Sequence, residues 1–307
     1  MSAADFLAAA MLGGLVLYAV TGGADFGGGV WDLVARGPRA ADQRRLIERA
    51  LAPVWEANHV WLIFVIVVLF SGFPPAFAAL GIRFHWPLTA ALIGIVLRGS
   101  AFVFRSYGGA PAWGRVFAVA SGATPLFLGV VLAGITVRSG DWLGVFPLAV
   151  GAFAVALGAY LAAVYLTCET ADPLLRADFR RRAAGSWISV AVLAVLVVVA
   201  APDGFARLLD PIIAAVTFAV AVAALVALVR GRVRAARVLA AGQVALIVIG
   251  WGAIQYPTLI APDLTIERAS APAATLRLLV PVLAIGGAIV LPSLYWLLRV
   301  FKSRPTG

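Results

Sequence analysis

The chain has few of the residue types that disulfide frameworks and metal centres need. Its 307 residues include one cysteine and two histidines. The single cysteine, Cys168, excludes an intramolecular disulfide and fits no metal-ligand pattern, so it is interpreted as a small residue at a helix end. Two histidines are too few to hold several haems, because each haem iron needs its own axial ligand. The sequence therefore predicts no metal site in this chain.

Charged residues are also scarce, and acidic ones most of all. Charged residues make up 12% of the chain and hydrophobic residues 63%, with 14 acidic against 24 basic side chains. A soluble domain has about 25% charged and about 45–50% apolar residues. This composition excludes a soluble domain and predicts a single integral-membrane domain over residues 1–307. The sequence contains no tandem repeat.

Nine apolar segments are long enough to cross a membrane, since a span needs about 20 mostly apolar residues. They predict an all-α polytopic membrane protein with nine transmembrane helices and termini on opposite sides. The first segment has no basic region before it, so it is expected to be a retained helix and not a cleaved signal. The break 257–277 is expected to be an ordered surface loop. The nine segments are 6–28, 52–73, 77–104, 114–137, 143–167, 185–201, 209–229, 238–256 and 278–300.

The basic residues indicate the orientation. Most of them fall in one set of breaks between the segments, and cytoplasmic loops are the ones that carry excess Lys and Arg. This places the N-terminus outside and the C-terminus in the cytoplasm. It also explains the net charge of +10 by topology and attraction to anionic lipid, which argues against nucleic-acid binding. The sparse set contains Arg83, Arg138, Arg207, Arg268 and Arg277.

Two carboxylates, Asp25 and Glu56, lie within the first two segments near their cytoplasmic ends. Each costs about 2.5–3.5 kcal/mol at membrane depth. Glu56 comes seven residues after Arg49, so it lies about 10 Å deeper along a helix. Such acids can move protons or ions, but they can also cap a helix or pair with arginine to fix helix register. The sequence leaves both interpretations open.

Other polar residues accompany Glu56. Trp55, Asn58 and His59 form a polar stripe with it, which is typical of a buried seam. For His59, haem ligation, a role on a proton path and plain packing all stay open. His85, beside aromatic residues near the outer end of the third segment, is interpreted as structural.

Arg98 and Arg105 lie seven residues apart and therefore on roughly one helix face. Arg98 falls inside the apolar run and is a candidate charge partner for Glu56 or Asp25. The alternative is that both arginines snorkel to lipid headgroups.

Glycines flank Asp25 and predict that a neighbouring helix comes close and covers its carboxylate. They do not indicate a dinucleotide site, because no strand precedes them. The glycines are Gly22, Gly23, Gly27, Gly28 and Gly29. Polar and aromatic residues near the eighth segment are expected to bond across helices as packing contacts: Gln243, Trp251, Gln255 and Tyr256.

Three blocks resemble subunit II of the cytochrome bd-type quinol oxidases, and their order covers nearly the whole chain. They are Tyr18-Ala-Val-Thr-Gly-Gly-Ala-Asp-Phe-Gly-Gly-Gly29, Ala52-Pro-Val-Trp-Glu-Ala-Asn-His-Val-Trp-Leu62 and Leu97-Arg-Gly-Ser-Ala-Phe-Val-Phe-Arg105. Weaker similarity extends through Tyr256–Ile266 and Ala271–Leu276. The family pattern Asp-Gly-Phe-Asp-x-Gly is altered here at Gly22 and Ala24. Its Pro-x-Trp-Asp-Gly-Asn block is altered at Glu56 and Ala57.

The resemblance implies an all-helical fold of two four-helix units plus one peripheral helix, in a bacterial cytoplasmic membrane. It implies a heterodimer with a haem-bearing subunit I, which holds two b-type haems, one d-type haem and the quinol site. The complex would oxidise quinol and reduce oxygen to water. This chain would ligate no catalytic haem, although a bound quinone, lipids or a small accessory subunit fit the resemblance.

The resemblance also implies roles for particular residues. Asp25 and Glu56 match positions on a cytoplasmic proton path, to which Asn58 and waters could contribute. The remaining motif positions are Gly23, Gly27, Trp55, His59 and Trp61.

Two other functions remain open from the residues alone. A proton-coupled secondary transporter could use the same acids, although the sequence shows no inverted repeat or matched broken helices. A scaffold that pairs with a redox partner of other chemistry would also carry such a bundle.

Overall fold

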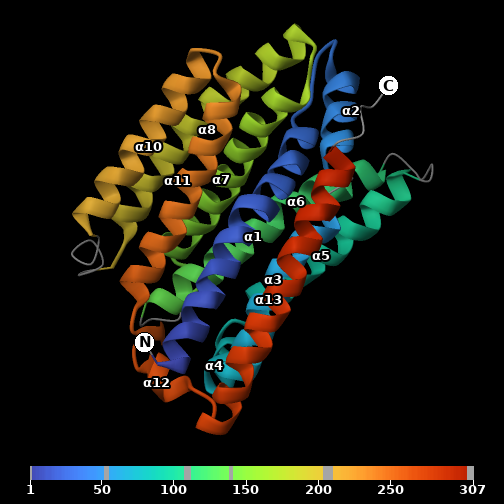
Figure 1. Cartoon of the computed structure of the whole chain (residues 1–307). Helices are drawn as coiled ribbons and strands as arrows, with labels where there is room; N and C mark the ends of the chain where they lie inside the picture. Colours follow the sequence, from blue (N-terminus) through green and yellow to red (C-terminus); the bar gives the residue numbers. More distant parts are fainter. Residues whose placement is uncertain (1, 52–54, 107–111, 138–140, 203–209, 303–307) are drawn as a thin grey trace.

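The chain forms a bundle of long helices (Figure 1). The computed structural model describes residues 2–51, 55–106, 112–137, 141–202 and 210–302, without the side chains of residues 51, 55–57, 106, 295 and 297–302. The helices are α1 (Ala3–Leu33), α2 (Ala40–Leu51), α3 (Trp55–Gly72), α4 (Pro74–Arg83), α5 (His85–Ser106), α6 (Ala112–Thr136), α7 (Val145–Glu169), α8 (Pro173–Ala200), α10 (Pro211–Val229), α11 (Val233–Gln255), α12 (Ile266–Ala269) and α13 (Ala273–Lys302).

Local sequence explains where several helices begin. Ser2 and Asp5 form a capping box at the start of α1, in which each side chain bonds the other residue's backbone N–H. Asp172 caps α8 by accepting from the N–H groups of Leu174 and Leu175, and Pro173 occupies the first helical position. These residues satisfy N–H groups that a helix start would otherwise leave unpaired.

The described residues contain eight helices that are long and apolar enough to span a membrane, or nine if one bent pair is a single span. The all-helical membrane fold is thus confirmed, while the count of nine stays a prediction. The bent pair is residues Asn58–Gly72 followed by Pro74–Arg83, with an angle of 115° between the helices.

The predicted segment 77–104 is wrong at its beginning. Residues 77–83 belong to α4, and the spanning helix α5 begins only at His85. Pro74 and Pro75 start α4 as a separate helix, because proline fits the first turn and cannot continue the ladder of α3. Phe73 and Phe84, one at each end of α4, are fully buried and anchor the bend. Hydropathy does not reveal such a bend, because the proline and phenylalanine residues at the ends of α4 are all apolar.

Helix α2 was not predicted either, because its composition is polar. It carries Asp42 in its first turn and Arg49 in its last, which suits the helix dipole. Its apolar residue Ile47 is 1% exposed and belongs to a core cluster with Phe117 of α6 and Phe179 of α8. The basic break after the first segment is therefore a docked amphipathic helix.

At the opposite end of the bundle, the break 257–277 is ordered, but it is not only a loop. Strands β1 (Thr258–Ile260) and β2 (Leu264–Thr265) pair antiparallel, and α12 follows directly. The Ala261 carbonyl accepts from Arg83 Nη1 at 2.9 Å, and its N–H donates to the Ile135 carbonyl at 2.8 Å. The small hairpin therefore joins α4 and α6 within an otherwise helical fold.

Helix α1 lies at the centre of the bundle. It packs against α7 and α11 on one side and against α3 and α6 on the other. In Figure 1, α7, α8, α10 and α11 stand together on the left, and α3, α5, α6 and α13 stand on the right. The division into two four-helix units and a peripheral helix remains a prediction.

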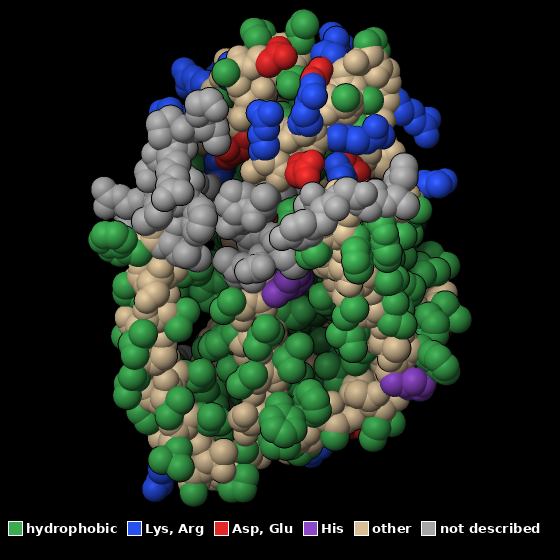
Figure 2. Space-filling view, turned by 90° about the vertical axis from the view of Figure 1, so that its right-hand side faces the viewer, with side chains coloured by type: hydrophobic (Ala, Val, Ile, Leu, Met, Phe, Trp, Pro, Cys, Tyr) green, Lys and Arg blue, Asp and Glu red, His purple; other side chains and the backbone are tan. Residues whose placement is uncertain are grey.

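The polarity of the surface follows the bundle axis. Figure 2 shows Lys and Arg side chains gathered at one end and a broad hydrophobic surface below them. The exposed apolar side chains include Ile63 and Phe70 of α3, Leu92 of α5 and Ile285 of α13. This pattern suits a protein surrounded by lipid or by another membrane subunit.

Candidate functional site

One face of α1 carries three buried polar side chains at seven-residue spacing: Tyr18, Asp25 and Asp32. Seven residues are nearly two helical turns, so the three side chains are stacked about 10 Å apart along the axis. Each has one oxygen with no hydrogen-bond partner among the described residues, namely Tyr18 Oη, Asp25 Oδ2 and Asp32 Oδ1. Buried polar groups are rarely left unpaired, so each of these oxygens calls for an explanation.

Asp25 forms an ion pair with Arg98 of α5 deep in the bundle. Arg98 Nη2 donates to Asp25 Oδ1 at 2.7 Å, and the two side chains are only 1–2% exposed. The same nitrogen lies 3.3 Å from the Asp25 carbonyl, and Arg98 Nε donates to Ser121 Oγ at 3.0 Å. Arg98 is therefore the charge partner of Asp25, and it does not reach the lipid surface.

Asp32 forms a second ion pair one step nearer the basic end. Arg105 Nη1 donates to Asp32 Oδ2 at 3.1 Å, and Arg44 Nε of α2 lies 4.0 Å from Asp32 Oδ1. Arg105 Nη2 is also 3.9 Å from Glu48 Oε2, whose side chain is 41% exposed. These contacts connect the buried Asp32 to the surface through α2.

A single aromatic ring joins the two ion pairs. The guanidinium carbons of Arg98 and Arg105 lie 4.9 and 5.9 Å from the ring centre of Phe117 in α6. Arg98 also lies 4.9 Å from the Phe26 ring. Cation–π contacts of this kind are stronger when the cation is desolvated, so these rings help to hold the buried guanidinium of Arg98.

The glycines of α1 bring α7 and α6 close to it. A Cβ on Gly27 would overlap the backbone of Gly158 in α7, and a Cβ on Gly29 would overlap Ser121 of α6. A Cβ on Gly23 would meet Leu161 only at an ordinary 3.8 Å. Asp25 points to α5 instead. Its carboxylate is 1% exposed and meets Arg98 of that helix, so a neighbouring helix does cover it. The covering helix is not the one at Gly27, because two residues turn a helix by about 200°.

The predicted residues of α3 lie beside this column only in part. Asn58 is buried, and the His59 ring lies 6.4 Å from the ring centre of Tyr18 and 6.2 Å from that of Phe26. Trp61, two residues on, is partly buried. The side chains of Trp55 and Glu56 lie outside the described residues, so their contacts stay predictions.

The expected bonds of α11 to its neighbours are found for two of four residues. Trp251 Nε1 donates to Thr136 Oγ1 at 3.0 Å, and Gln255 Nε2 donates to the Ile135 carbonyl at 3.3 Å. Gln243 is buried, and its Oε1 has no partner among the described residues, whereas Tyr256 is exposed.

The chemistry of the donors does not fit a haem held by this chain. His59 is packed among aromatic rings, and His85 sits at the exposed start of α5 with Nδ1 3.1 Å from the Ile82 carbonyl. Neither lines the cavity beside Trp31 and Ser186 or the one beside Arg36 and Asp178. The described residues contain no group of three or more His, Cys, Asp or Glu that could hold a metal ion.

Four residues of the site were not identified in the sequence: Tyr18 as a polar group, Asp32, Arg44 and Glu48. The signal for Asp32 was available, because Asp25 and Asp32 repeat the spacing of Arg98 and Arg105. Two oppositely charged pairs with the same spacing on two helices predict a ladder. Arg44 and Glu48 belong to the unpredicted helix α2.

The assembled site is a polar column within an apolar bundle. It begins at Glu48 and Arg105, continues through Asp32 and reaches Asp25 in the interior. Each carboxylate has one oxygen that accepts a hydrogen bond from arginine and one without a described hydrogen-bond partner, although Arg44 lies 4.0 Å from that oxygen of Asp32. Such oxygens can bind a water or accept a proton.

Comparison with known proteins gives a consistent relationship over the chain. A family model described as cytochrome bd terminal oxidase subunit II matches residues 3–301. The cytochrome bd-I ubiquinol oxidase subunit 2 of Escherichia coli (strain K12) is 29% identical over 140 residues, which are 43% of this chain and 36% of that protein. The cytochrome bd ubiquinol oxidase subunit 2 of Bacillus subtilis (strain 168) is 33% identical over 63 residues, or 20% of this chain and 19% of that protein.

These alignments span well under two thirds of each relative. A solved structure of the bd oxidase from Geobacillus thermodenitrificans has a chain with a TM-score of 0.68, which covers 98% of this chain and 99% of that chain. Its sequence identity is 13%, so this likeness concerns the fold.

Proposed function

Because the chain belongs to the family of cytochrome bd terminal oxidase subunit II, we propose that it is the subunit of a quinol oxidase complex that carries no catalytic haem. Its partner is a haem-bearing subunit I, in a heterodimer that oxidises quinol and reduces oxygen to water in the bacterial cytoplasmic membrane. The haems would supply electrons to oxygen. The contribution of this chain is to stabilise that partner and to deliver protons.

The observation that carries the proposal is the column of ion pairs on α1 and α5. Reduction of one oxygen molecule to water consumes four protons, which must cross apolar protein to reach a buried centre. Glu48 lies at the exposed end of the column, and Asp32 and Asp25 follow at increasing depth. A proton enters at Glu48, binds Oδ1 of Asp32, which has no described hydrogen-bond partner, and moves to Asp25 through waters about 10 Å further along α1.

The arginines have a separate task on this path. Arg98 and Arg105 keep each carboxylate at a fixed depth and orientation, because each binds one carboxylate oxygen. A buried carboxylate without such a partner carries a desolvation penalty of several kcal/mol. Asn58 and Glu56 of α3 extend the path beyond Asp25 toward the partner subunit. This extension is supported by the buried position of Asn58.

The remaining parts of the proposal concern the orientation of the chain in the membrane and the molecules that contact its surface. The basic end of the bundle faces the cytoplasm, which the excess of Arg at that end supports (Figure 2). Quinol binds in the partner, and lipid or a small accessory subunit covers part of the apolar surface. The transporter alternative is not favoured, because the family model covers residues 3–301.

Asp32 is the residue whose replacement tests the path most directly. The assembled complex with Asp32→Asn should consume oxygen at least about tenfold more slowly with saturating quinol, because proton relay by a positioned group typically contributes that much or more. Its haem content should equal that of the unchanged complex. The matched control is Asp42→Asn, an exposed acid of the same end, on α2, that pairs with Arg45.

Proton uptake from the two sides of a reconstituted vesicle separates conduction from assembly. Slow uptake with normal haem reduction supports a path through Asp32. Full turnover in Asp32→Asn with intact haem would remove the path while leaving the subunit assignment in place. A purified chain that never co-purifies with a haem-bearing subunit would remove the assignment itself.

A further inference from the structure

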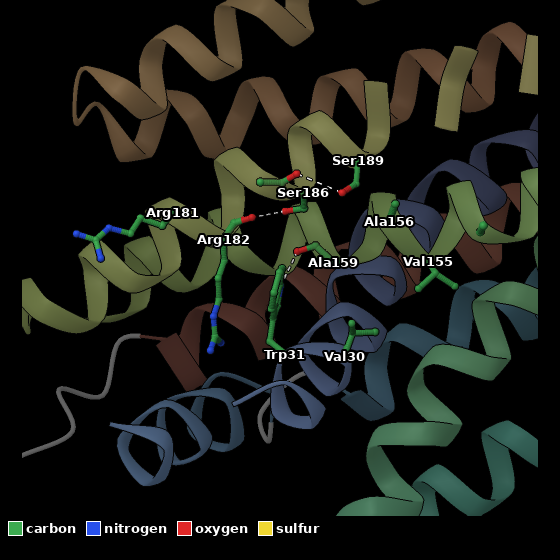
Figure 3. Close-up of a pocket in the computed structure, with 11 residues that line it drawn as sticks. Val30, Trp31, Val155, Ala156, Ala159, Arg181, Arg182, Ser186 and Ser189 are labelled. Atoms are coloured by element: carbon green, nitrogen blue, oxygen red, sulfur yellow. Dashed lines mark hydrogen bonds between the residues drawn. The ribbon is translucent and has the colours of Figure 1, made fainter. Parts of the chain in front are cut away.

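A groove runs along the bundle surface between α1, α7 and α8 (Figure 3). Its volume is about 640 Å³, within the range of roughly 300–1,000 Å³ that small-molecule sites occupy. One stretch of its wall is aliphatic, with Val30 of α1 and Ala152, Val155 and Ala156 of α7. Such a wall suits a hydrocarbon chain.

The two serines that line the groove leave its wall suited to a hydrocarbon chain. Ser186 Oγ donates to the Arg182 carbonyl at 2.6 Å, and Ser189 Oγ donates to the Gly185 carbonyl at 3.2 Å. Both hydroxyl groups are thus satisfied by the backbone of their own helix, as the dashed lines in Figure 3 show. The α8 wall therefore does not require a polar ligand along the chain portion of the groove.

The other end of the groove is strongly basic. Arg181 and Arg182 line it, and both also line a second pocket of about 260 Å³ at the basic end of the bundle. That second pocket adds Arg36 and Arg39 from the segment between α1 and α2, with Asp178 as its only acid. Four arginines against one aspartate leave an excess of positive charge beside an aliphatic groove.

The four arginines of the second pocket differ in whether their side chains already have partners. Arg39 donates to both oxygens of Asp178, at 2.8 and 2.7 Å, and these hydrogen bonds raise the pKa of Arg39 above its ordinary value. Gln43 donates to Asp178 at 3.0 Å and accepts from Arg182 Nη2 at 2.7 Å. Arg182 is further fixed between the rings of Trp31 and Phe179, each 5.2 Å from its guanidinium carbon.

The remaining two cations, Arg36 and Arg181, are exposed and form no hydrogen bond or ion pair with a described residue. Both line the second pocket, and Arg181 also lines the groove. An anion at this position would meet two guanidinium groups with unused donors, next to a third that is held rigidly. Arginine binds phosphate with paired N–H donors, which makes it well suited to a phosphodiester.

We propose that the groove and its basic end form a binding site for one anionic phospholipid. The phosphodiester headgroup lies between Arg36 and Arg181, and one acyl chain follows the aliphatic wall of α1 and α7. A quinone has a neutral headgroup, so it would leave the two arginines without a counter-charge. A soluble phosphate would leave the aliphatic wall empty. Basic pockets between membrane helices at the cytoplasmic face are suited to anionic lipid headgroups.

Native mass spectrometry of the full chain with its partner subunit, in mild detergent, tests this site. Phosphatidylglycerol and phosphatidylcholine with identical acyl chains are the probes. One molecule of phosphatidylglycerol should remain bound at collision energies that remove phosphatidylcholine. Removal of both unused cations in Arg36→Ala/Arg181→Ala should weaken phosphatidylglycerol binding about thirtyfold, since each basic residue near the surface contributes about a fivefold gain.

A second variant tests the chain portion independently of charge. Gly185 lines the groove, and a Cβ there meets nothing within 4 Å, so Gly185→Phe fills the groove without a backbone clash. It should abolish the retained phosphatidylglycerol. The matched controls are Arg115→Ala, an exposed arginine of the same end on α6, and Gly242→Phe, an equally open glycine of α11. Both controls should bind the lipid as the unchanged chain does.

Three results would overturn the proposal. Equal retention of the two lipids would show that charge plays no part. Retention that both variants leave unchanged would place the bound lipid elsewhere. A decylubiquinone adduct that Gly185→Phe removes and Arg36→Ala/Arg181→Ala does not would make the occupant a quinone.

Discussion

Asp25 and Arg98 are almost completely withdrawn from solvent, and their contacts explain how two full charges are tolerated there. The pair is joined at 2.7 Å, Ser121 accepts from the guanidinium, and Phe26 and Phe117 lie against its faces. A buried ion pair contributes little net stability compared with apolar residues of the same size. The pair is therefore better explained by a requirement for a charged or protonatable group at this depth than by stability.

Removal of one partner should be worse than removal of both. Arg98→Ala leaves an uncompensated carboxylate, which costs about 3–5 kcal/mol, so the yield of assembled complex should fall severely. Asp25→Asn/Arg98→Leu should recover much of the yield, because no unpaired charge remains, but not the oxygen consumption. Fluorescence-detected size-exclusion chromatography measures the yield. A double variant as poorly assembled as Arg98→Ala would mean that Arg98 acts through packing.

A further prediction for a single residue concerns Glu56, whose side chain lies outside the described residues. Glu56→Gln keeps the shape of the side chain and removes its proton exchange, so turnover with oxygen should fall while assembly and haem content stay normal. Glu56→Asp, which restores the acid that the family pattern has at this position, should retain turnover. Unchanged turnover in Glu56→Gln would remove Glu56 from the path.

The sequence was sufficient to identify Asp25, Arg98 and Arg105 as buried or interfacial charges, because each interrupts an apolar run. It was insufficient to choose between Asp25 and Glu56 as the partner of Arg98, since helix rotation decides that choice. It also missed Asp32, which lies at the end of the apolar segment where a charge looks ordinary. In the folded chain Asp32 is buried and pairs with arginines of α2 and α5.

At the scale of elements, the position of α1 depends on its contact with α7. The backbones of Gly27 and Gly158 are so close that neither position has room for a Cβ; one added at Gly158 would lie 2.7 Å from the Gly23 carbonyl oxygen. Small residues permit such approach of membrane helices, and van der Waals contact then holds them together. Because Asp25 and Asp32 are on α1, this contact also sets where the column lies.

Gly27→Ala should therefore destabilise the chain, and Gly23→Ala should not. The added methyl of the first meets backbone that cannot move aside, and overpacking of this kind costs about 1–3 kcal/mol or more. The methyl of the second meets Leu161 only at 3.8 Å. Thermal unfolding of the two purified variants measures the difference as a lower midpoint for Gly27→Ala alone. Equal midpoints would mean that α1 and α7 adjust without loss.

Apolar length predicted the long helices well, because a span must satisfy its backbone groups internally. It predicted the break between α3 and α5 poorly. The residues of α4 are as apolar as a span, and Pro74 with Pro75 marks a helix start only when the bend is already suspected. Helix α2 was missed for the opposite reason, because one buried isoleucine among charged residues does not resemble a core helix.

At the scale of the whole molecule, the bundle has one basic end and an apolar surface along its sides. The basic end contains the start of the polar column, at Glu48 and Arg105. It also contains the arginines beside the groove, Arg36 and Arg181. The opposite end is closed by β1, β2 and α12. Proton uptake and anionic lipid binding are therefore both assigned to the same face of the membrane.

The orientation of that face determines what the column can do. If the basic end is cytoplasmic, the protons used in oxygen reduction come from the cytoplasm, and their uptake builds a membrane potential. If the basic end is external, the protons come from outside, and their uptake builds none. In a Cys168→Ser background, Asp263→Cys near the hairpin should react with a membrane-impermeant maleimide in intact cells, and Arg234→Cys at the start of α11 should react only after lysis. Both positions are exposed, so accessibility alone does not separate them. Labelling of Arg234→Cys in intact cells would reverse the orientation, and the column could not then be a cytoplasmic proton path.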